Sequence, residues 1–107
     1  MSHFINNSEN CVFTCILCDY KLKQYINSQI MMFCTKDQIK FYSLDITQEL
    51  YILLETFNFK DIISITSKKE AKNIIIICFN GKQANEMFAM DLITTDDSKS
   101  FIKRVRK

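Results

Sequence analysis

The chain has 107 residues, is 48% hydrophobic and carries a formal net charge of +2, with one glycine and no proline. This length suits one domain with one core, so we treat residues 1–107 as a single domain. The hydrophobic content excludes an intrinsically disordered chain, and the small net charge does not indicate direct nucleic-acid binding. The longest apolar run, Ile74–Phe79, is far shorter than the roughly 20 residues that span a bilayer. Met1–Asn10 is polar, so we expect a flexible start and no secretory leader.

A period of two dominates the first half of the chain and predicts strands. Cys11–Tyr20 is the first predicted strand, and Ser28–Cys34 is apolar on both faces, as in a central strand. Thr35-Lys36-Asp37 predicts a turn, after which Gln38–Leu44 alternates apolar and polar residues. Leu50–Phe59 fits one face of a helix as well as a strand. Its aromatic and β-branched residues favour the strand.

The second half continues the period of two and then changes to a helical period. Three further strands are predicted: Asp61–Thr66, Asn73–Phe79 and Gln83–Met90. Asn80-Gly81 is typical of a two-residue type I′ hairpin turn, which needs positive φ angles. Thr95-Asp96-Asp97 offers capping residues for a helix over Ser98–Lys107, whose basic end complements the helix dipole.

The residues that usually carry catalysis or bind metals do not form a readable site. The cysteine count of 5 is odd, which indicates free thiols in a reducing compartment. Cys11, Cys15 and Cys18 have the spacing of a radical iron–sulfur motif, but positions 15 and 18 of one strand face opposite sides and cannot meet at one cluster. The single histidine is His3, and one glycine cannot build a phosphate-binding loop. We therefore predict no enzyme activity, no cofactor and no metal.

About seven antiparallel strands followed by one C-terminal helix predict a mainly β domain, with a bent sheet or barrel capped by the helix. This order resembles the pleckstrin-homology superfold. Gln29–Phe41 is similar to the second and third strands of its GRAM-type members. Phe59–Ile65, Asn73–Phe79 and Glu86–Met90 are similar to their fifth to seventh strands.

Within the superfold, the chain most resembles the amino-terminal domains of the pleckstrin-homology-bearing core subunit of the general transcription and DNA-repair factor IIH (TFIIH). The resemblance rests on these residues: Asp61-Ile62, 68–72, Gly81, Asn85, Phe88 and the helix opening Asp97–Ile102. It implies a non-enzymatic protein-docking domain in the nucleus. Such a domain would bind acidic–hydrophobic segments of transcription or nucleotide-excision-repair proteins, within a larger complex.

The same resemblance implies where the partner binds. Lysines attract an acidic segment, and apolar grooves beside them hold its aromatic or aliphatic anchors. The partner-binding candidates from the resemblance are Lys68, Lys69, Lys72, Gln83 and Asn85, to which the local sequence adds Lys60 and Lys82. The family has polar positions on the sixth strand where this chain has Ile74–Ile77 and Cys78, so the contact face stays open.

Two other binding functions remain alternatives. A phosphoinositide-binding pleckstrin-homology or GRAM-type domain, in the cytoplasm or at an endosomal membrane, would use Lys21 and Lys23. The facing strand Ile30–Phe33 carries no lysine or arginine, so a phosphate cage lacks half of its donors. A ubiquitin-binding domain of the endosomal-sorting kind has no feature in the sequence that separates it from the docking domain.

Overall fold

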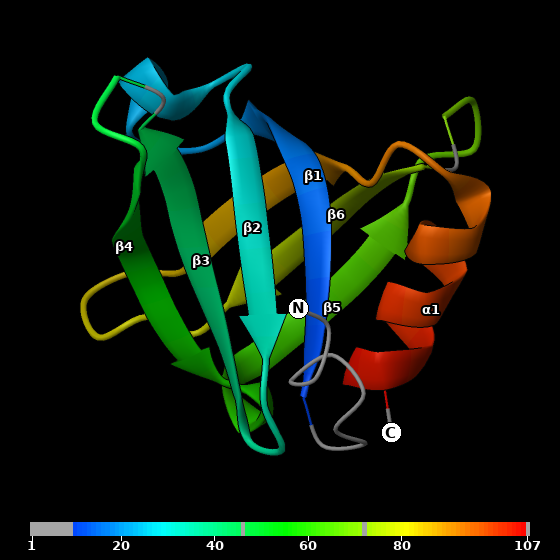
Figure 1. Ribbon diagram of the computed structural model, residues 1–107. Coiled ribbons are helices and arrows are strands. Elements are labelled where there is room, and N and C mark those ends of the chain that lie inside the picture. Colours follow the sequence, from blue (N-terminus) through cyan, green and yellow to red (C-terminus); the bar gives the residue numbers. More distant parts are fainter. Residues whose placement is uncertain (1–9, 46, 72, 107) are drawn as a thin grey trace.

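The computed structural model describes residues 10–45, 47–71 and 73–106 as seven strands and one C-terminal helix (Figure 1). The strands are β1 (Cys11–Asp19), β2 (Gln29–Cys34), β3 (Gln38–Asp45), β4 (Leu50–Asn58), β5 (Ile62–Ser67), β6 (Ile74–Phe79) and β7 (Glu86–Asp91), followed by α1 (Thr95–Val105). Short 3₁₀ turns, η1 (Lys23–Tyr25) and η2 (Phe59–Asp61), precede β2 and β5. Residues 1–9, for which we predicted flexibility, and Lys72 lie outside the described residues.

All seven strands belong to one bent antiparallel sheet, which confirms the predicted fold class. The strand order is β4-β3-β2-β1-β7-β6-β5, so β1 joins the two halves and β4 and β5 are the edges. A register shift in β1 between Leu17 and Asp19 lies where β1 pairs with β7, and such irregularities increase the local bend of a strand. Figure 1 shows β1–β4 crossing in front of β5–β7, with α1 at one side of the sheet.

The ambiguous segment over Leu50–Phe59 is a strand, as the sequence favoured. β4 pairs with β3 along its whole length, from Gln38 opposite Asn58 to Asp45 opposite Leu50. The pairing shifts between Phe41 and Tyr42 and leaves Leu54 as an extra residue. The leucines that suggested a helix face are therefore divided between the two faces of a bulged strand.

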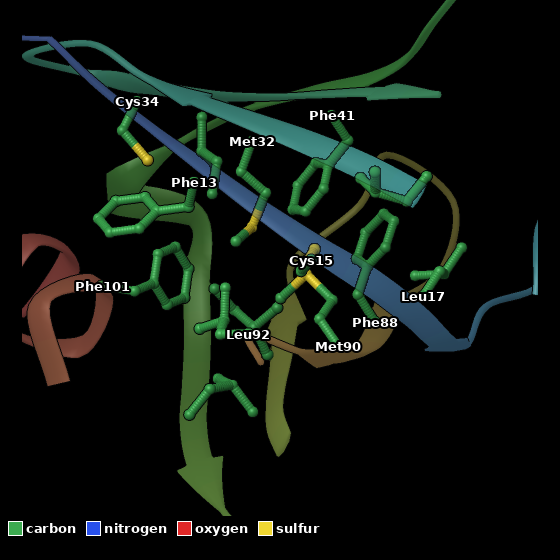
Figure 2. Packing of buried hydrophobic residues seen from close by; sticks show 14 of the residues in the cluster. Phe13, Cys15, Leu17, Met32, Cys34, Phe41, Phe88, Met90, Leu92 and Phe101 are labelled. Carbon is green, nitrogen blue, oxygen red and sulfur yellow. The ribbon is translucent and has the colours of Figure 1, made fainter. Parts of the chain in front are cut away.

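Aromatic rings fill the space between the two halves of the sheet (Figure 2). Phe41 stacks on Phe88 with ring centroids 4.2 Å apart, and Phe57 stacks on Phe79 at 4.0 Å. Phe101 of α1 is fully buried and meets the ring of Phe13 edge-on. Because burial of such rings dominates core energetics, α1 closes one side of the core through Phe101.

The predicted tight turn at Asn80-Gly81 is wrong, although β6 and β7 pair as expected. β6 ends at Phe79 and β7 begins at Glu86, opposite Phe79, so residues 80–85 form a longer loop. Gly81 has no positive φ angle, which a type I′ turn would require. The backbone N–H of Asn80 instead donates to the carbonyl of Asp61 at 2.8 Å. This bond ties Asn80 to the end of η2, so the chain does not reverse direction at Asn80-Gly81.

The C-terminal helix is confirmed within residues 94–107, where we expected it, but it begins before Ser98. The side chain of Thr94 accepts a hydrogen bond from the backbone N–H of Asp97 at 3.1 Å, so Thr94 is the N-cap. Asp96 and Asp97, predicted as caps, lie instead in the first turn, where their charge complements the helix dipole. The helix therefore spans Thr95–Val105, three residues ahead of the predicted start at Ser98.

Candidate functional site

The structure separates the predicted partner-binding residues into two groups. Lys68 and Lys69 lie in the connection from β5 to β6, while Lys82, Gln83 and Asn85 lie in the loop from β6 to β7. These connections are at opposite ends of β6, a strand of six residues that spans roughly 20 Å. Lys60 in η2 belongs with the second group, because its neighbour Asp61 is hydrogen-bonded to Asn80. Lys72 is outside the described residues.

Acidic side chains lie beside the first of these groups. Glu70 and Asp91 line a cavity of about 420 Å³ between the β5–β6 connection and the start of α1. Burial and the nearby Asp91 raise the pKa of the Cys18 thiol, while Lys68 lowers it. Lys68 and Asp91 therefore both lie close enough to Cys18 to affect its thiol.

A second cavity, of about 550 Å³, opens between β4, η2 and the loop of residues 80–85. Its charged lining consists of Glu55, Asp61, Glu86 and Lys82, and most of its other polar side chains are amides. Carboxylates thus outnumber amines in the lining. Sequence patterning did not indicate this cavity, because its walls come from segments far apart in the chain.

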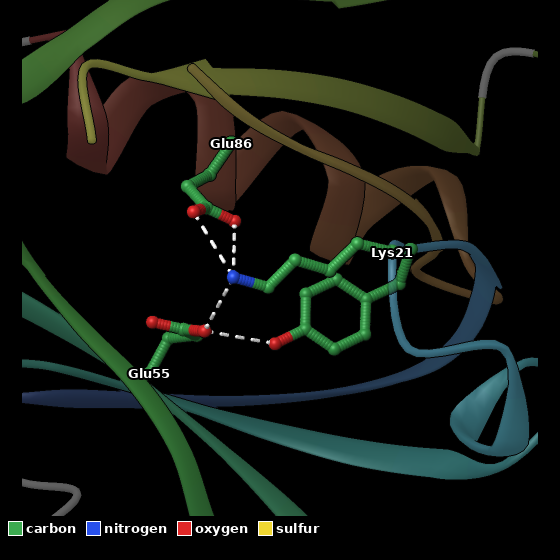
Figure 3. Close-up of polar contacts among 4 residues, drawn as sticks. Lys21, Glu55 and Glu86 are labelled. Carbon is green, nitrogen blue, oxygen red and sulfur yellow. Dashed lines mark hydrogen bonds and ion pairs between the residues drawn. The ribbon is translucent and has the colours of Figure 1, made fainter. Parts of the chain in front are cut away.

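Lys21 joins the two sides of this cavity (Figure 3). Its Nζ lies 3.0 Å from each carboxylate oxygen of Glu86 and 3.5 Å from Oε2 of Glu55. The hydrogen bond to Glu86 raises the pKa of Lys21, since it favours the charged amine. Two carboxylates from β4 and β7 therefore surround the amine that a phosphate site would use.

Tyr20 extends the same network. Its hydroxyl donates to Oε2 of Glu55 at 3.0 Å, and its ring stacks on Phe88 with centroids 4.6 Å apart. Burial of Tyr20, followed by its hydrogen bond to Glu55, raises the pKa of the phenol, so it stays a donor. Lys23, the other candidate phosphate ligand, forms an ion pair with Asp19 at 3.4 Å.

An exposed apolar segment is the second feature that sequence reasoning missed. Leu50, Tyr51, Ile52 and Leu53 are between 38% and 51% exposed, although they are consecutive residues of β4. The ring of Tyr51 meets that of Tyr42 on the neighbouring strand edge-on, at 6.4 Å. An apolar run in a sequence usually indicates burial, and only the position of β4 at the sheet edge leaves this one open.

The cysteines and the other possible metal ligands form no metal site in the described part of the chain. Across residues 10–45, 47–71 and 73–106, no group of three or more His, Cys, Asp or Glu side chains could hold a metal ion. Cys11, Cys15, Cys18, Cys34 and Cys78 are free thiols. No helix within the same ranges is both long and apolar enough to cross a membrane.

Comparison with known proteins identifies the fold. No family model and no curated protein matches the sequence. A solved structure described as "PH domain from TgAPH" is similar over 88% of this chain and 78% of that chain, with a TM-score of 0.64 and 12% sequence identity. The chain has a pleckstrin-homology-like fold. At 12% identity this likeness shows the fold alone.

Proposed function

We propose that this pleckstrin-homology-like domain is a non-enzymatic docking module for proteins rather than for membrane lipids. The observation that carries the proposal is the position of Lys21 between two carboxylates, with its Nζ 3.0 Å from Glu86 and 3.5 Å from Glu55. An inositol phosphate at this loop would have to displace both carboxylates or accept their repulsion at close range. Lys23 is engaged by Asp19, and β2 supplies no basic side chain.

The partner class in this proposal is the one that the TFIIH resemblance implies: an acidic segment with an aromatic or aliphatic anchor. Lys68 and Lys69 are exposed and lie on a connection between strands, where a flexible partner has access. A role in a transcription or repair factor, with location in the nucleus, belongs to the same proposal. A disordered segment loses conformational freedom when it binds, so the Kd should be on the order of micromolar. Because the attraction is between charges, binding should weaken as the salt concentration rises.

Titration with an acidic peptide that carries one aromatic anchor, followed by fluorescence anisotropy, tests the proposal. The triple variant Lys68→Glu, Lys69→Glu, Lys72→Glu should bind at least about tenfold more weakly, since it replaces attraction by repulsion. The double variant Lys99→Glu, Lys103→Glu is the matched control, because both lysines are exposed on α1. It should bind as the wild type does.

Sedimentation with phosphatidylcholine vesicles containing a phosphoinositide tests the lipid alternative. The wild type should stay in the supernatant. The lipid alternative would be correct if the wild type co-sediments with the vesicles, the double variant Lys21→Gln, Lys23→Gln does not, and the acidic peptide does not bind. Peptide binding that is lost only in Lys60→Glu, Lys82→Glu would move the contact to the other end of β6.

A further inference from the structure

Two of the cysteines lie directly opposite each other on neighbouring strands. β1 pairs antiparallel with β2, and the first residue of β1, Cys11, is the register partner of the last residue of β2, Cys34. Both are free thiols. The spacing of cysteines in the sequence did not indicate this pair, because the pair depends on the register between two strands and not on a motif within one.

Both side chains belong to the core side of the sheet. Opposite residues of an antiparallel pair share one face, and the next inward pair along these strands, Phe13 and Met32, is buried. Cys34 is fully buried, and Cys11 is half-buried and packs against the same cluster. Figure 2 shows Cys34 on the side of the core where Phe13 and Phe101 lie. The two thiols therefore face the same part of the core.

Strand geometry brings the two residues within reach of a disulfide. The backbone N–H of Leu17 donates to the carbonyl of Ser28, which follows in the same register, at 3.0 Å. Since hydrogen-bonded pairs alternate along a ladder, Cys11 and Cys34 also form such a pair, with Cα atoms about 5.5 Å apart. Disulfides span roughly 4.4–6.8 Å between Cα atoms but prefer Cβ atoms about 3.8 Å apart, somewhat closer than in this pair. A small movement of the two strand ends therefore allows the bond.

The two thiols differ in access and in the charges around them. Cys11 is partly open to solvent, while Cys34 is enclosed by the core. Burial raises the pKa of the Cys34 thiol, the guanidinium of Arg104 lowers it, and the neighbouring Cys11 raises it. Cys11 is thus the thiol that meets a dissolved oxidant first, and Arg104 is the cation that favours the thiolate of Cys34 in a later step.

We propose that Cys11 and Cys34 form a reversible cross-strand disulfide when the protein meets a peroxide. The Cys11 thiolate attacks one peroxide oxygen, the O–O bond breaks, and Cys11 becomes a sulfenic acid while the other oxygen leaves as water. The sulfur of Cys34 then attacks the sulfur of Cys11. The S–S bond forms, the S–O bond breaks, and a second water leaves with the proton of Cys34. Two electrons pass from the two thiols to the peroxide.

The bond should be easy to reduce, because the pair is wider than a relaxed disulfide and strained disulfides are the labile ones. Two molecules of a small thiol restore the pair by exchange and become a disulfide themselves. This redox site goes beyond the proposed docking function and does not rest on it.

The bridge would act on the region of the sheet that contacts α1. Nη2 of Arg104 donates to the carbonyl of Thr35 at 2.9 Å, and Thr35 directly follows Cys34. The ring of Phe101 meets that of Phe13 edge-on at 5.4 Å. Movement of Cys34 towards Cys11 therefore reaches the C-terminal helix through both contacts.

The other cysteines, all within the described residues, have no cysteine opposite them. Cys15 lies opposite Ile30 and Cys78 opposite Met87, while Cys18 is the extra residue where the register of β1 against β7 shifts. Cys18 is half-buried on β1, as Cys11 is, and it therefore provides a matched control.

Treatment of the purified protein with hydrogen peroxide, followed by mass spectrometry without reductant, tests the proposal. The wild type should lose two hydrogen atoms and link Cys11 to Cys34, and dithiothreitol should reverse the change. Trypsin leaves Cys11, Cys15 and Cys18 on one peptide, so fragment ions between these residues assign the bridge. The link should be absent in Cys11→Ser and intact in Cys18→Ser.

Thermal unfolding gives a second measurement. The oxidised wild type should melt at least about 5 °C above the reduced protein, because the bridge constrains the unfolded chain. Peroxide should produce no such rise in Cys11→Ser. An equal or lower melting temperature of the oxidised wild type would contradict a bridge that fits the native register.

Three further results would overturn the inference. The first is a link that persists in Cys11→Ser or that is lost in Cys18→Ser. The second is a sulfenic acid at Cys11 that dimedone traps while no bridge forms. The third is a disulfide-linked dimer as the main product, which would mean that Cys11 reacts with a second copy of the chain.

Discussion

Burial strongly changes the chemistry of Cys15 and Cys34. Both are completely buried among the apolar side chains of the core. Burial raises the pKa of each thiol to about 12, because the core does not stabilise a thiolate. Arg104 lowers the pKa of Cys34, and burial outweighs it. These cysteines pack as small hydrophobic residues and are poor nucleophiles.

We expect the free energy of unfolding to fall between about pH 9 and pH 12, since thiols in the unfolded chain ionise near 9 and the buried ones only near 12. The contribution is fully present below pH 9 and declines by up to about 1.4 kcal/mol per thiol for each pH unit above it. Urea unfolding at several pH values measures this slope. Cys15→Ala, Cys34→Ala should flatten it, and an unchanged slope would contradict the assignment.

At the scale of single elements, the loop of residues 80–85 requires a glycine at position 81 because another part of the loop backbone lies very close to it, and not because of a turn geometry. A Cβ atom added at Gly81 would overlap the carbonyl oxygen of Ala84. That atom belongs to the backbone of the same loop, so a side chain at position 81 requires the loop to move. Glycine is needed here although its φ angle is not positive.

Gly81→Ala should therefore lower stability by about 1 kcal/mol, and Gly81→Val by at least as much, because the clash begins at the Cβ atom. Lys82→Ala in the same loop is exposed and should change stability by less than about 0.5 kcal/mol. Thermal unfolding compares the three variants. Equal melting temperatures for Gly81→Ala and Lys82→Ala would show that the loop adjusts without cost.

At the scale of the whole molecule, the cavity beside β4 is held by contacts between distant parts of the chain. Tyr20 and Glu55 are 35 positions apart, and Lys21 and Glu86 are 65 apart. These contacts connect the end of β1 with β4 and β7. The same contacts engage the amine of Lys21, which a phosphate ligand would need. They also hold Glu55 of β4 in place.

Tyr20→Phe should lower the free energy of unfolding by about 1–2 kcal/mol, since it removes a hydrogen bond to a charged, part-buried carboxylate and keeps the stacked ring. Tyr51→Phe is the control, because Tyr51 is 49% exposed and should be close to neutral. Urea unfolding gives both values. A loss in Tyr20→Phe no larger than in Tyr51→Phe would mean that water replaces the hydroxyl contact.

Alternation of apolar and polar residues in β3, and continuous apolar runs in β2 and β6, were sufficient to predict those strands. Such patterns report which side chains a sheet buries, and this depends mostly on neighbours in the same strand. The switch to a helical period after Thr95 predicted α1 for the same reason. The N-cap was misplaced because Thr94, Thr95, Asp96 and Asp97 can each serve as a cap, and only the extended backbone at Thr94 selects it.

The sequence by itself therefore determined the class of the domain: a bent sheet of antiparallel strands and one closing helix. Only the tertiary structure decided that β4 is an open edge and that Lys21 is held between Glu55 and Glu86. The physical reason is the range of the contacts. Periodicity records the environment along one strand, whereas an edge or an ion pair depends on which distant segments fold next to it.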